Sequence, residues 1–344
     1  MELSKEELKR YSRHLSLPEV GTQGQEKLKQ SKVLIIGAGG LGCPAAIYLA
    51  AAGVGTIGIV DFDKVELSNL QRQILYTEED IGKPKTSIIK NQLEKLNKNI
   101  NINIYNEKLT SKNALEIIRN YDVIIDGSDN FPTRYLVNDA CFFLKKPNVY
   151  GSIFRFDGQA SVFNYQNGPC YRCLKPVPPS EATIPNCAEA GVIGVLPGII
   201  GTIQATEAIK IILGIGDTLS GKLLVYNALS MNFKKLNLNK NKNCPICGIN
   251  PTIKTLNEKN KMEEISVKEL KEIMDKKEDF VLIDVREKVE WDLGRIEGAI
   301  LIPLSQIKNN NFGDLENIDK NKHIILQCRT GGRSADVLNI LKNR

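Results

Sequence analysis

The sequence predicts an α/β protein of two unequal domains, each built around a mostly parallel sheet. Short runs of β-branched and apolar residues alternate with helical patterns along the chain, which is typical of such sheets. A glycine-rich loop separates the first of these runs from an alanine-rich segment. The length of 344 residues fits two or three domains of roughly 100–200 residues each.

The elements of the larger domain follow in a regular order. Residues 1–30 are polar with a helical pattern. The apolar runs predict strands at 32–36, 56–60 and 123–126. After the first strand, the glycine loop opens a helix that we expect to run to Ala52 and to stop at Gly53.

A segment rich in Asn, Lys and Thr divides the chain. We expect the large domain over residues 1–248, a linker over 249–262 and the small domain over 263–344. The patterns of the small domain predict strands at 280–284 and 323–327 and helices at 266–276 and 334–342. This domain carries 14 Lys and Arg against 16 Asp and Glu, so an acidic partner would meet the more basic large domain.

Composition narrows the function classes. Apolar residues make up 42% of the chain and no run approaches the ~20 apolar residues of a spanning helix, so we expect no membrane partner. The net charge of +6 is small for this length, so we expect no nucleic acid partner.

The first ten residues are charged, unlike those of a secretory signal. This favours a location in the cytoplasm or, for an organelle-encoded chain, in the plastid stroma. With two histidines, the chemistry must rely on Cys, Asp, Lys and Arg.

Four of the eight cysteines form two Cys-x-x-Cys pairs, Cys170 with Cys173 and Cys244 with Cys247. Two such pairs can supply the four thiolates of a closed, structural zinc site, provided that the fold brings them together across about 70 residues. A redox dithiol and two unrelated pairs are the alternatives.

The loop at 37–42 has glycines at its first, third and sixth positions, the spacing of a Rossmann-like nucleotide-binding turn. Asp61 ends the next predicted strand about 20 residues later, where it can accept hydrogen bonds from a ribose. This pattern indicates an adenosine nucleotide without distinguishing NAD from ATP, and a turn without ligand is the remaining alternative. Arg72 and Lys85 favour ATP because both could reach a triphosphate, and Asp129 could hold Mg²⁺.

Together these segments resemble the MoeB/ThiF/HesA family, bacterial relatives of ubiquitin-activating enzymes. The resemblance covers about residues 8 to 248 and rests on the cysteine pairs and on the segments 37–43, 61–63, 67–73, 82–85 and 126–130. It implies ATP-dependent adenylation of the C-terminal glycine of a ubiquitin-like sulfur carrier, with structural zinc on the cysteines and Mg²⁺ on Asp129. The implied ATP site comprises Gly40, Asp61, Ser68, Asn69, Leu70, Gln71, Arg72, Lys85, Asp129 and Asn130. Arg13 would reach the nucleotide of the partner subunit in a homodimer.

The resemblance leaves the carrier open. We favour a MoaD-like carrier, the small subunit of molybdopterin synthase. A ThiS-like carrier for thiamine and a tRNA-thiolation carrier are alternatives, and a cysteine desulfurase is a candidate sulfur donor. Two other functions are an NAD-dependent oxidoreductase and a scaffold whose nucleotide site is inert.

Three further cysteines of the large domain need separate explanations. Cys187 follows a proline-rich stretch and precedes an apolar segment, so its thiol could lie near a helix N-terminus, where it would be a better nucleophile. By the resemblance it could take the activated carboxyl or form a mixed disulfide with a persulfide; a small buried hydrophobe is the alternative. Cys43 and Cys141 lie in predicted helices with apolar neighbours, and we expect them in the core.

The last cysteine opens a loop between a predicted strand and a predicted helix. The loop consists of Cys328, Arg329, Thr330, Gly331, Gly332 and Arg333. Its backbone N–H groups and two arginines could hold an anionic sulfur, as a persulfide or a phosphocysteine. With the segments at 281–287 and 294–300, this loop resembles a rhodanese domain, which implies a persulfide carrier with sulfurtransferase activity. That family usually has His at the position of Arg295 and continues with another strand and helix, so the small domain is expected to be C-terminally shortened.

Overall fold

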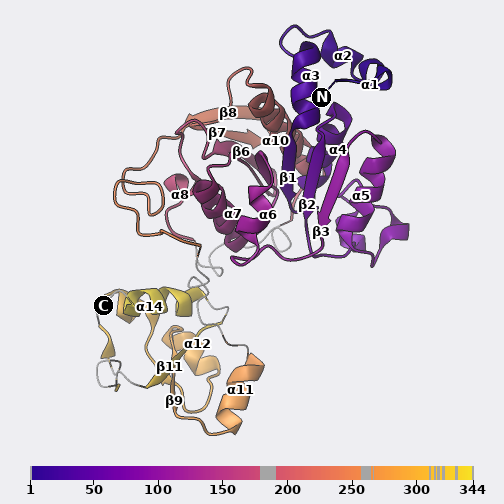
Figure 1. Ribbon diagram of the computed structural model, residues 1–344. Coiled ribbons are helices and arrows are strands. Elements are labelled where there is room, and N and C mark those ends of the chain that lie inside the picture. The colour runs from indigo at the N-terminus through magenta and orange to yellow at the C-terminus, as the bar shows by residue number, and fades with distance from the viewer. Residues whose placement is uncertain are drawn as a thin grey trace. The chain divides into compact units, whose positions relative to one another are not determined.

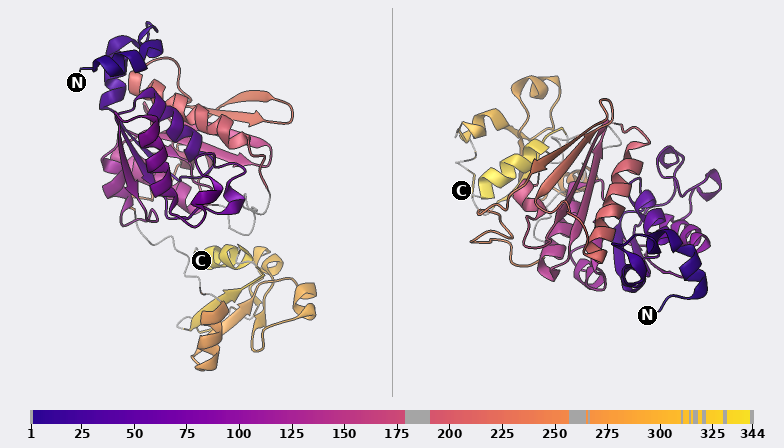
Figure 2. Two further views of the ribbon diagram at one scale, coloured as in Figure 1. Left: turned by 90° about the vertical axis from the view of Figure 1, so that its right-hand side faces the viewer. Right: turned by 90° about the horizontal axis from the view of Figure 1, so that it is seen from above.

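The structure, a computed structural model, describes residues 2–178, 191–256, 265, 267–309, 311–313, 315, 318–319, 322–329 and 332–342. The described residues form two compact units, the first ending at Leu256 (Figures 1 and 2). Both units are α/β, which confirms the predicted fold class.

The large unit is built on one eight-stranded sheet, in the order β3-β2-β1-β4-β5-β6-β7-β8. The strands are β1 (Lys32–Ile36), β2 (Thr56–Val60), β3 (Asn101–Tyr105), β4 (Val123–Asp126), β5 (Asn148–Phe154), β6 (Asp157–Phe163), β7 (Lys222–Asn227) and β8 (Asn232–Asn237). The first five in this order are parallel and the last three antiparallel, so the predicted mostly parallel sheet is confirmed. The strand order reverses between β1 and β4, and ligands bind outside the carboxyl ends of strands at such a point.

Helices cover both faces of this sheet (Figure 1). They are α1 (Lys5–Arg10), α2 (Ser12–Leu15), α3 (Gly21–Gln30), α4 (Gly42–Ala52), α5 (Lys85–Leu96), α6 (Ala114–Arg119), α7 (Phe131–Leu144), α8 (Tyr171–Leu174) and α10 (Leu196–Leu213), with 3₁₀ turns η1 (Leu67–Asn69) and η2 (Glu78–Asp80). Side chains of β1 alternate between two buried clusters, one packed under α4, α5 and α10 and one under α6 and α7. Burial on both faces explains why the strand is a continuous apolar run.

Helix α4 ends where the sequence predicts. Gly53 has a φ of 83° and terminates the helix in the left-handed conformation. A Cβ at this position would lie 2.5 Å from the hydroxyl oxygen of Tyr11, so the N-terminal helices pack closely on this end of α4.

Helix α10 is the one described helix long and apolar enough to cross a membrane by length and composition. Pro197 lies in its first turn, where proline is tolerated, and the helix continues to Leu213. Within the structure it packs on α4, β5 and β6, and its buried Gln204 donates to the carbonyl oxygens of Asp126 and Val149. These contacts are those of a core helix.

The small unit has a three-stranded parallel sheet in the order β10-β9-β11. Its strands are β9 (Phe280–Asp284), β10 (Ile300–Leu301) and β11 (His323–Gln327), and its helices are α11 (Val267–Asp275), α12 (Lys288–Leu293), α13 (Leu304–Lys308) and α14 (Gly332–Lys342). The two predicted strands are confirmed, and α14 begins two residues earlier than predicted. Apolar residues of β9, α13 and α14 form its core.

Candidate functional site

The glycine loop leaves β1 at the point where the strand order reverses. Gly37 has a φ of 93°, and a Cβ on Gly42 would lie 1.9 Å from the carbonyl oxygen of Gly37. A Cβ on Gly37 would in turn lie 3.0 Å from the carbonyl oxygen of Gly127, at the end of β4. Glycine is therefore required for the turn itself and for its close packing against the next strand.

Asp61 holds this loop from the end of β2. Its carboxylate accepts hydrogen bonds from the backbone N–H groups of Ala38 and Asp63, both at 2.7 Å, and burial raises its pKa. The hydroxyl of buried Tyr76 donates to the carbonyl oxygen of Ala38 at 2.7 Å. Both side chains therefore fix the loop backbone, a role for Tyr76 that the sequence patterns did not indicate.

The residues from Ser68 to Arg72 form a tight turn beside the loop. The Arg72 guanidinium donates to the carbonyl oxygen of Ser68 at 3.0 Å, and a Cβ on Gly40 would lie 3.6 Å from Arg72 Cγ. Asn69 is buried and accepts from the N–H of Glu66, whereas Ser68 and Gln71 are exposed and Leu70 is half-buried. The structure thus brings Arg72 next to Gly40, and Asn69 supports the turn from within.

Lys85 begins α5 and is 5% exposed. Its amine lies 3.1 Å from the Asp63 carboxylate, two residues after Asp61. The side chain of Asp63 is half exposed, so the ammonium is held at the edge of the site by a partner that faces solvent. Lys85 and Asp61 therefore belong to one local cluster.

Asp129 and Asn130 are exposed and follow β4. The Asn130 side-chain oxygen accepts from the N–H of Thr133 at 2.9 Å, so Asn130 is the N-cap of α7. On either side of this pair in the sequence lie two buried residues, Asp126 and Arg134, that the sequence patterns did not assign to the site. Asp126 is fully buried and accepts from the N–H and hydroxyl of Ser128, and Arg134 donates to the Ser128 carbonyl oxygen at 2.9 Å.

Arg13 lies on α2, at the opposite end of α4 from the glycine loop. The neighbouring His14 contacts Gln25, which donates to the carbonyl oxygen of Ala52 at the end of α4. Because the eleven residues of α4 span roughly 16 Å, the exposed Arg13 and the loop of the same chain lie at different edges of the sheet.

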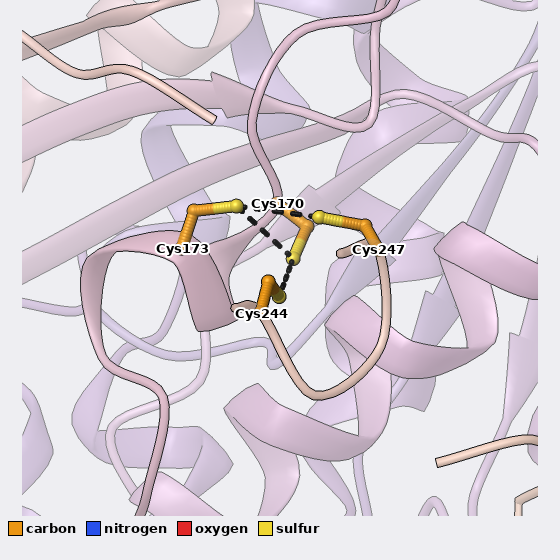
Figure 3. A group of neighbouring side chains, drawn as sticks. All are labelled: Cys170, Cys173, Cys244 and Cys247. Atoms are coloured by element: carbon orange, nitrogen blue, oxygen red, sulfur yellow. Dashed lines mark hydrogen bonds between the residues drawn. The ribbon is translucent and has the colours of Figure 1, made fainter. Parts of the chain in front are cut away.

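The four cysteines of the two pairs meet in space (Figure 3). Their sulfur atoms all lie within 4.8 Å of one another, and neighbouring sulfurs are 3.3–3.9 Å apart. Four sulfurs about 2.3 Å from one tetrahedral ion would be about 3.8 Å apart, so the set fits a single metal ion. Hydrogen bonds among the four sulfurs lower the pKa of Cys173 and Cys244 and raise that of Cys170 and Cys247. A metal ion would require all four as thiolates.

Cys328 follows β11 in the small unit, and α14 begins at Gly332. Its half-buried sulfur lies 3.6 Å from the hydroxyl oxygen of Ser334. Arg329 is exposed, while both terminal nitrogens of Arg333 bond the Glu290 carboxylate and lower the pKa of that carboxyl to about 2. The guanidinium of Arg333 is thus directed to Glu290, because a carboxylate matches its two parallel donors better than a single sulfur does. Thr330 and Gly331 lie outside the described residues.

Of the remaining three cysteines, two lie in the core. Burial raises the pKa of Cys43 to about 12 and that of Cys141 well above its usual value, and both side chains are fully buried, which confirms their place in the core. Cys187 lies outside the described residues.

Comparison with known proteins supplies relatives for both units. A sulfur carrier protein adenylyltransferase from Thermus thermophilus is 53% identical over 261 residues, covering 74% of this chain and 96% of the relative. The adenylyltransferase and sulfurtransferase MOCS3 of Drosophila yakuba is 44% identical, covering 99% of this chain and 80% of the relative. A "probable molybdopterin-synthase adenylyltransferase" of Porphyra purpurea is 46% identical, covering 99% and 90%.

A solved structure and two family models also match the chain. A crystal structure of E. coli MccB with MccA-N7isoASN superposes with a TM-score of 0.63 at 25% identity, covering 72% of this chain and 75% of that one. The ThiF family model matches residues 11–246, and the model of the rhodanese-like domain matches residues 266–344. The chain therefore belongs to the ThiF family and carries a rhodanese-like domain after its ThiF domain.

Proposed function

We propose that this protein uses ATP to adenylate the C-terminal glycine of a ubiquitin-like sulfur carrier and then supplies persulfide sulfur from its rhodanese-like domain. The observation that carries the proposal is the carboxyl edge of the sheet, where the glycine loop lies beside Arg72 and closely packed against the loop that leads to Asp129. The relatives named adenylyltransferase and sulfurtransferase support both halves of it. We expect the reaction in the cytoplasm, or in the plastid stroma of an organelle-encoded chain.

Adenylation needs charge stabilisation more than acid–base catalysis. The carrier's glycine carboxylate attacks the α-phosphorus of ATP, and pyrophosphate leaves with the displaced bond pair. A carboxylate is already ionised at neutral pH, so the low number of histidines is no obstacle. In our proposal the loop backbone and Asp61 hold the nucleotide, and Arg72 and Lys85 bind its phosphates. Asp129 would hold Mg²⁺, which neutralises phosphate charge when bound.

Sulfur transfer follows in two balanced steps. The persulfide of Cys328 attacks the acyl carbon of the carrier adenylate, and AMP leaves. A second thiolate, for which we propose Cys187, attacks the Cys328 sulfur, so that a disulfide forms and the carrier leaves as a thiocarboxylate. A cysteine desulfurase is the proposed source of the persulfide sulfur.

The carrier that we propose is MoaD-like, in line with the relative named for molybdopterin synthase. ATP–pyrophosphate exchange with purified MoaD-like, ThiS-like and tRNA-thiolation carriers tests this choice. We expect exchange to be fastest with the MoaD-like carrier. Exchange with none of them, together with NAD binding, would support the oxidoreductase alternative instead.

We propose zinc as the metal of the four-cysteine cluster, where it would be closed to substrate and structural. Cys173→Ser is expected to abolish zinc binding at the cluster and to lower the Tm of the large unit, by about 2–4 °C for each kcal/mol of stability that is lost. Metal analysis and calorimetry measure both. Cys328→Ser, in the other unit, is the control and should retain the metal; a Cys173→Ser protein with full zinc content would contradict the assignment.

We propose a homodimer in which each Arg13 serves the nucleotide of the other subunit. The side of α10 that adjoins α4 carries Thr202, Thr206 and Ile209 beside Tyr48, which is 57% exposed, so this surface is available for contact with a second copy. Arg13 lies at the far end of α4 from the glycine loop of its own chain. This placement supports a dimer in which Arg13 contacts the nucleotide of the other subunit.

Mixing two inactive variants tests this arrangement. Arg13→Ala and Lys85→Ala dimers, allowed to exchange subunits, should regain about a quarter of wild-type ATP–pyrophosphate exchange, since half of the dimers are mixed and each has one intact site. If Arg13 acted within its own chain, no mixed dimer would have an intact site and no activity would return.

A further inference from the structure

Helix α7 connects the four-cysteine cluster to the loop that carries Asp129. Asn130 caps its first turn, and Asn138 and Asp139 in its third turn contact the short helix α8, which follows Cys170 and contains Cys173. The contact at each end is made by a buried arginine, Arg134 at the loop and Arg172 at the cluster, 6% and 4% exposed. Buried arginines are costly unless their donors are paired, so their partners show what they hold in place.

At the cluster end, the contact is a two-pronged ion pair. Arg172, between the two cysteines of the first pair, donates from Nε and Nη2 to the two carboxylate oxygens of Asp139 at 2.8 and 2.7 Å. The side-chain oxygen of Asn138 accepts from the N–H of Tyr171 at 2.7 Å. The first cysteine pair is therefore fixed to α7 by three hydrogen bonds that are buried from solvent.

At the loop end, Arg134 binds the backbone beside Asp129. Its Nη2 donates to the carbonyl oxygen of Ser128 at 2.9 Å, and Asp126, whose carboxylate accepts from the N–H and hydroxyl of Ser128, lies at the base of the same loop. The guanidinium also lies over the ring of Tyr150, 5.1 Å from its centroid. Ser128 is thus held from both sides, and Asp129 follows it directly.

Aromatic rings join the two ends. The Arg172 guanidinium lies 4.6 Å from the ring centroid of Tyr135, which meets Tyr171 edge-on at 5.1 Å. Tyr171 lies 5.4 Å from Tyr150, the ring under Arg134. A continuous set of buried side chains therefore runs from the cluster to the loop, and it includes no residue that we place on the nucleotide or on the metal.

We propose that Arg134 and Arg172 are positioning residues that anchor the Asp129 loop to the four-cysteine cluster through α7, and thereby set the affinity for Mg²⁺–ATP. This inference rests on the proposed role of Asp129 in holding Mg²⁺. The loop is exposed at Asp129 and Asn130, so its geometry depends on the buried side of the turn. Nucleotide without Mg²⁺ would be held by the glycine loop, Arg72 and Lys85, none of which accepts or donates the hydrogen bonds described for Arg134 and Arg172.

The test is calorimetric titration of the full-length protein with ATP, with and without Mg²⁺ and without carrier, so that no adenylate forms. Arg134→Met is expected to raise the Kd of Mg²⁺–ATP about 10-fold and to leave the Kd of Mg²⁺-free ATP within about 2-fold, since a hydrogen bond to a charged group is lost near Asp129 alone. Arg134→Lys should recover part of the loss. Arg119→Met, an exposed arginine on neighbouring α6, is the matched control and should bind as wild type.

The cluster end needs a variant that leaves no buried charge behind. Arg172→Met with Asp139→Leu removes both partners of the ion pair and should retain the fold and the bound metal, with the Kd of Mg²⁺–ATP raised several-fold. Combined with Arg134→Met, its effect should be less than the product of the two, because both act through one network.

Three results would overturn the inference. The first is an unchanged Kd for Mg²⁺–ATP in folded Arg134→Met. The second is an equal rise in the Kd of ATP with and without Mg²⁺. The third is a combined variant whose Kd rises by the full product of the two separate effects. Failure of the wild type to bind Mg²⁺–ATP at all is a different result, because it would overturn the adenylation proposal on which the inference rests.

Discussion

Replacing Lys85 by methionine is expected to lower ATP–pyrophosphate exchange by about 10²-fold, the order of loss seen when one preorganised donor to a developing charge is removed. The side chain is 5% exposed, so methionine preserves most of its packing while the ammonium is lost. Its partner Asp63 is half exposed, so water can solvate the carboxylate that is left alone. The variant should therefore fold with nearly unchanged stability, and the loss should be chemical.

The neighbouring Lys83 provides the control for this experiment. It lies two residues away, its side chain is 53% exposed and it pairs with Asp80 at 3.5 Å, so Lys83→Met should exchange pyrophosphate at close to the wild-type rate. Equal activity of Lys85→Met and Lys83→Met would contradict the proposed phosphate contact. It would also favour the NAD-dependent oxidoreductase, for which Lys85 has no evident use.

Replacing Cys328 by serine is expected to reduce thiocarboxylate formation by at least about 10³-fold, as for loss of a nucleophile, and to leave ATP–pyrophosphate exchange unchanged. We expect only the sulfur-transfer reaction to be affected, because the Cys328 sulfur lies in a unit with its own sheet and core. The assay mixes protein, ATP, carrier and thiosulfate, and mass spectrometry detects the exchange of one carrier oxygen for sulfur.

The Lys85→Met protein completes the comparison, since it should lose both reactions. Serine has nearly the shape of cysteine, and the oxygen would still lie near the Ser334 hydroxyl, so the small unit should remain folded. Full sulfur transfer by Cys328→Ser would show that the persulfide is carried elsewhere. Loss of pyrophosphate exchange in this variant would contradict the division of the chemistry between two sites.

The parts of the fold that were predictable are those with local signals. The strands that begin at Lys32, Thr56 and Val123 are buried on both faces and therefore read as continuous apolar runs. Strand β6 carries no such run and β8 is exposed throughout, whereas β7 has an apolar run at 223–226 that was not assigned to a strand from the sequence, so the second half of the sheet was not predicted. Of the pairings that build this half, only that of β6 with β7 joins distant segments, whereas β5–β6 and β7–β8 are hairpins.

The contacts of the candidate site also comprise some that the sequence predicted and some that it could not. Spacing predicted the glycine loop and Asp61, because a phosphate-binding turn demands glycine at fixed positions within a few residues. It could not predict that Arg333 pairs with Glu290 or that Tyr76 holds Ala38, because each contact joins residues about 40 positions apart that only packing brings together.

By itself, the sequence determined the fold class, the nucleotide loop and the identity of the four cysteines, since glycine spacing, strand periodicity and Cys-x-x-Cys pairs are local properties of a chain. Only the tertiary structure decided that two pairs separated by about 70 residues form one cluster. It also decided that Arg134 and Arg172, which look like ordinary surface charges in the sequence, are buried between that cluster and the Asp129 loop. The physical reason is that burial of a charge requires a partner, and the partners come from elements that only folding brings together.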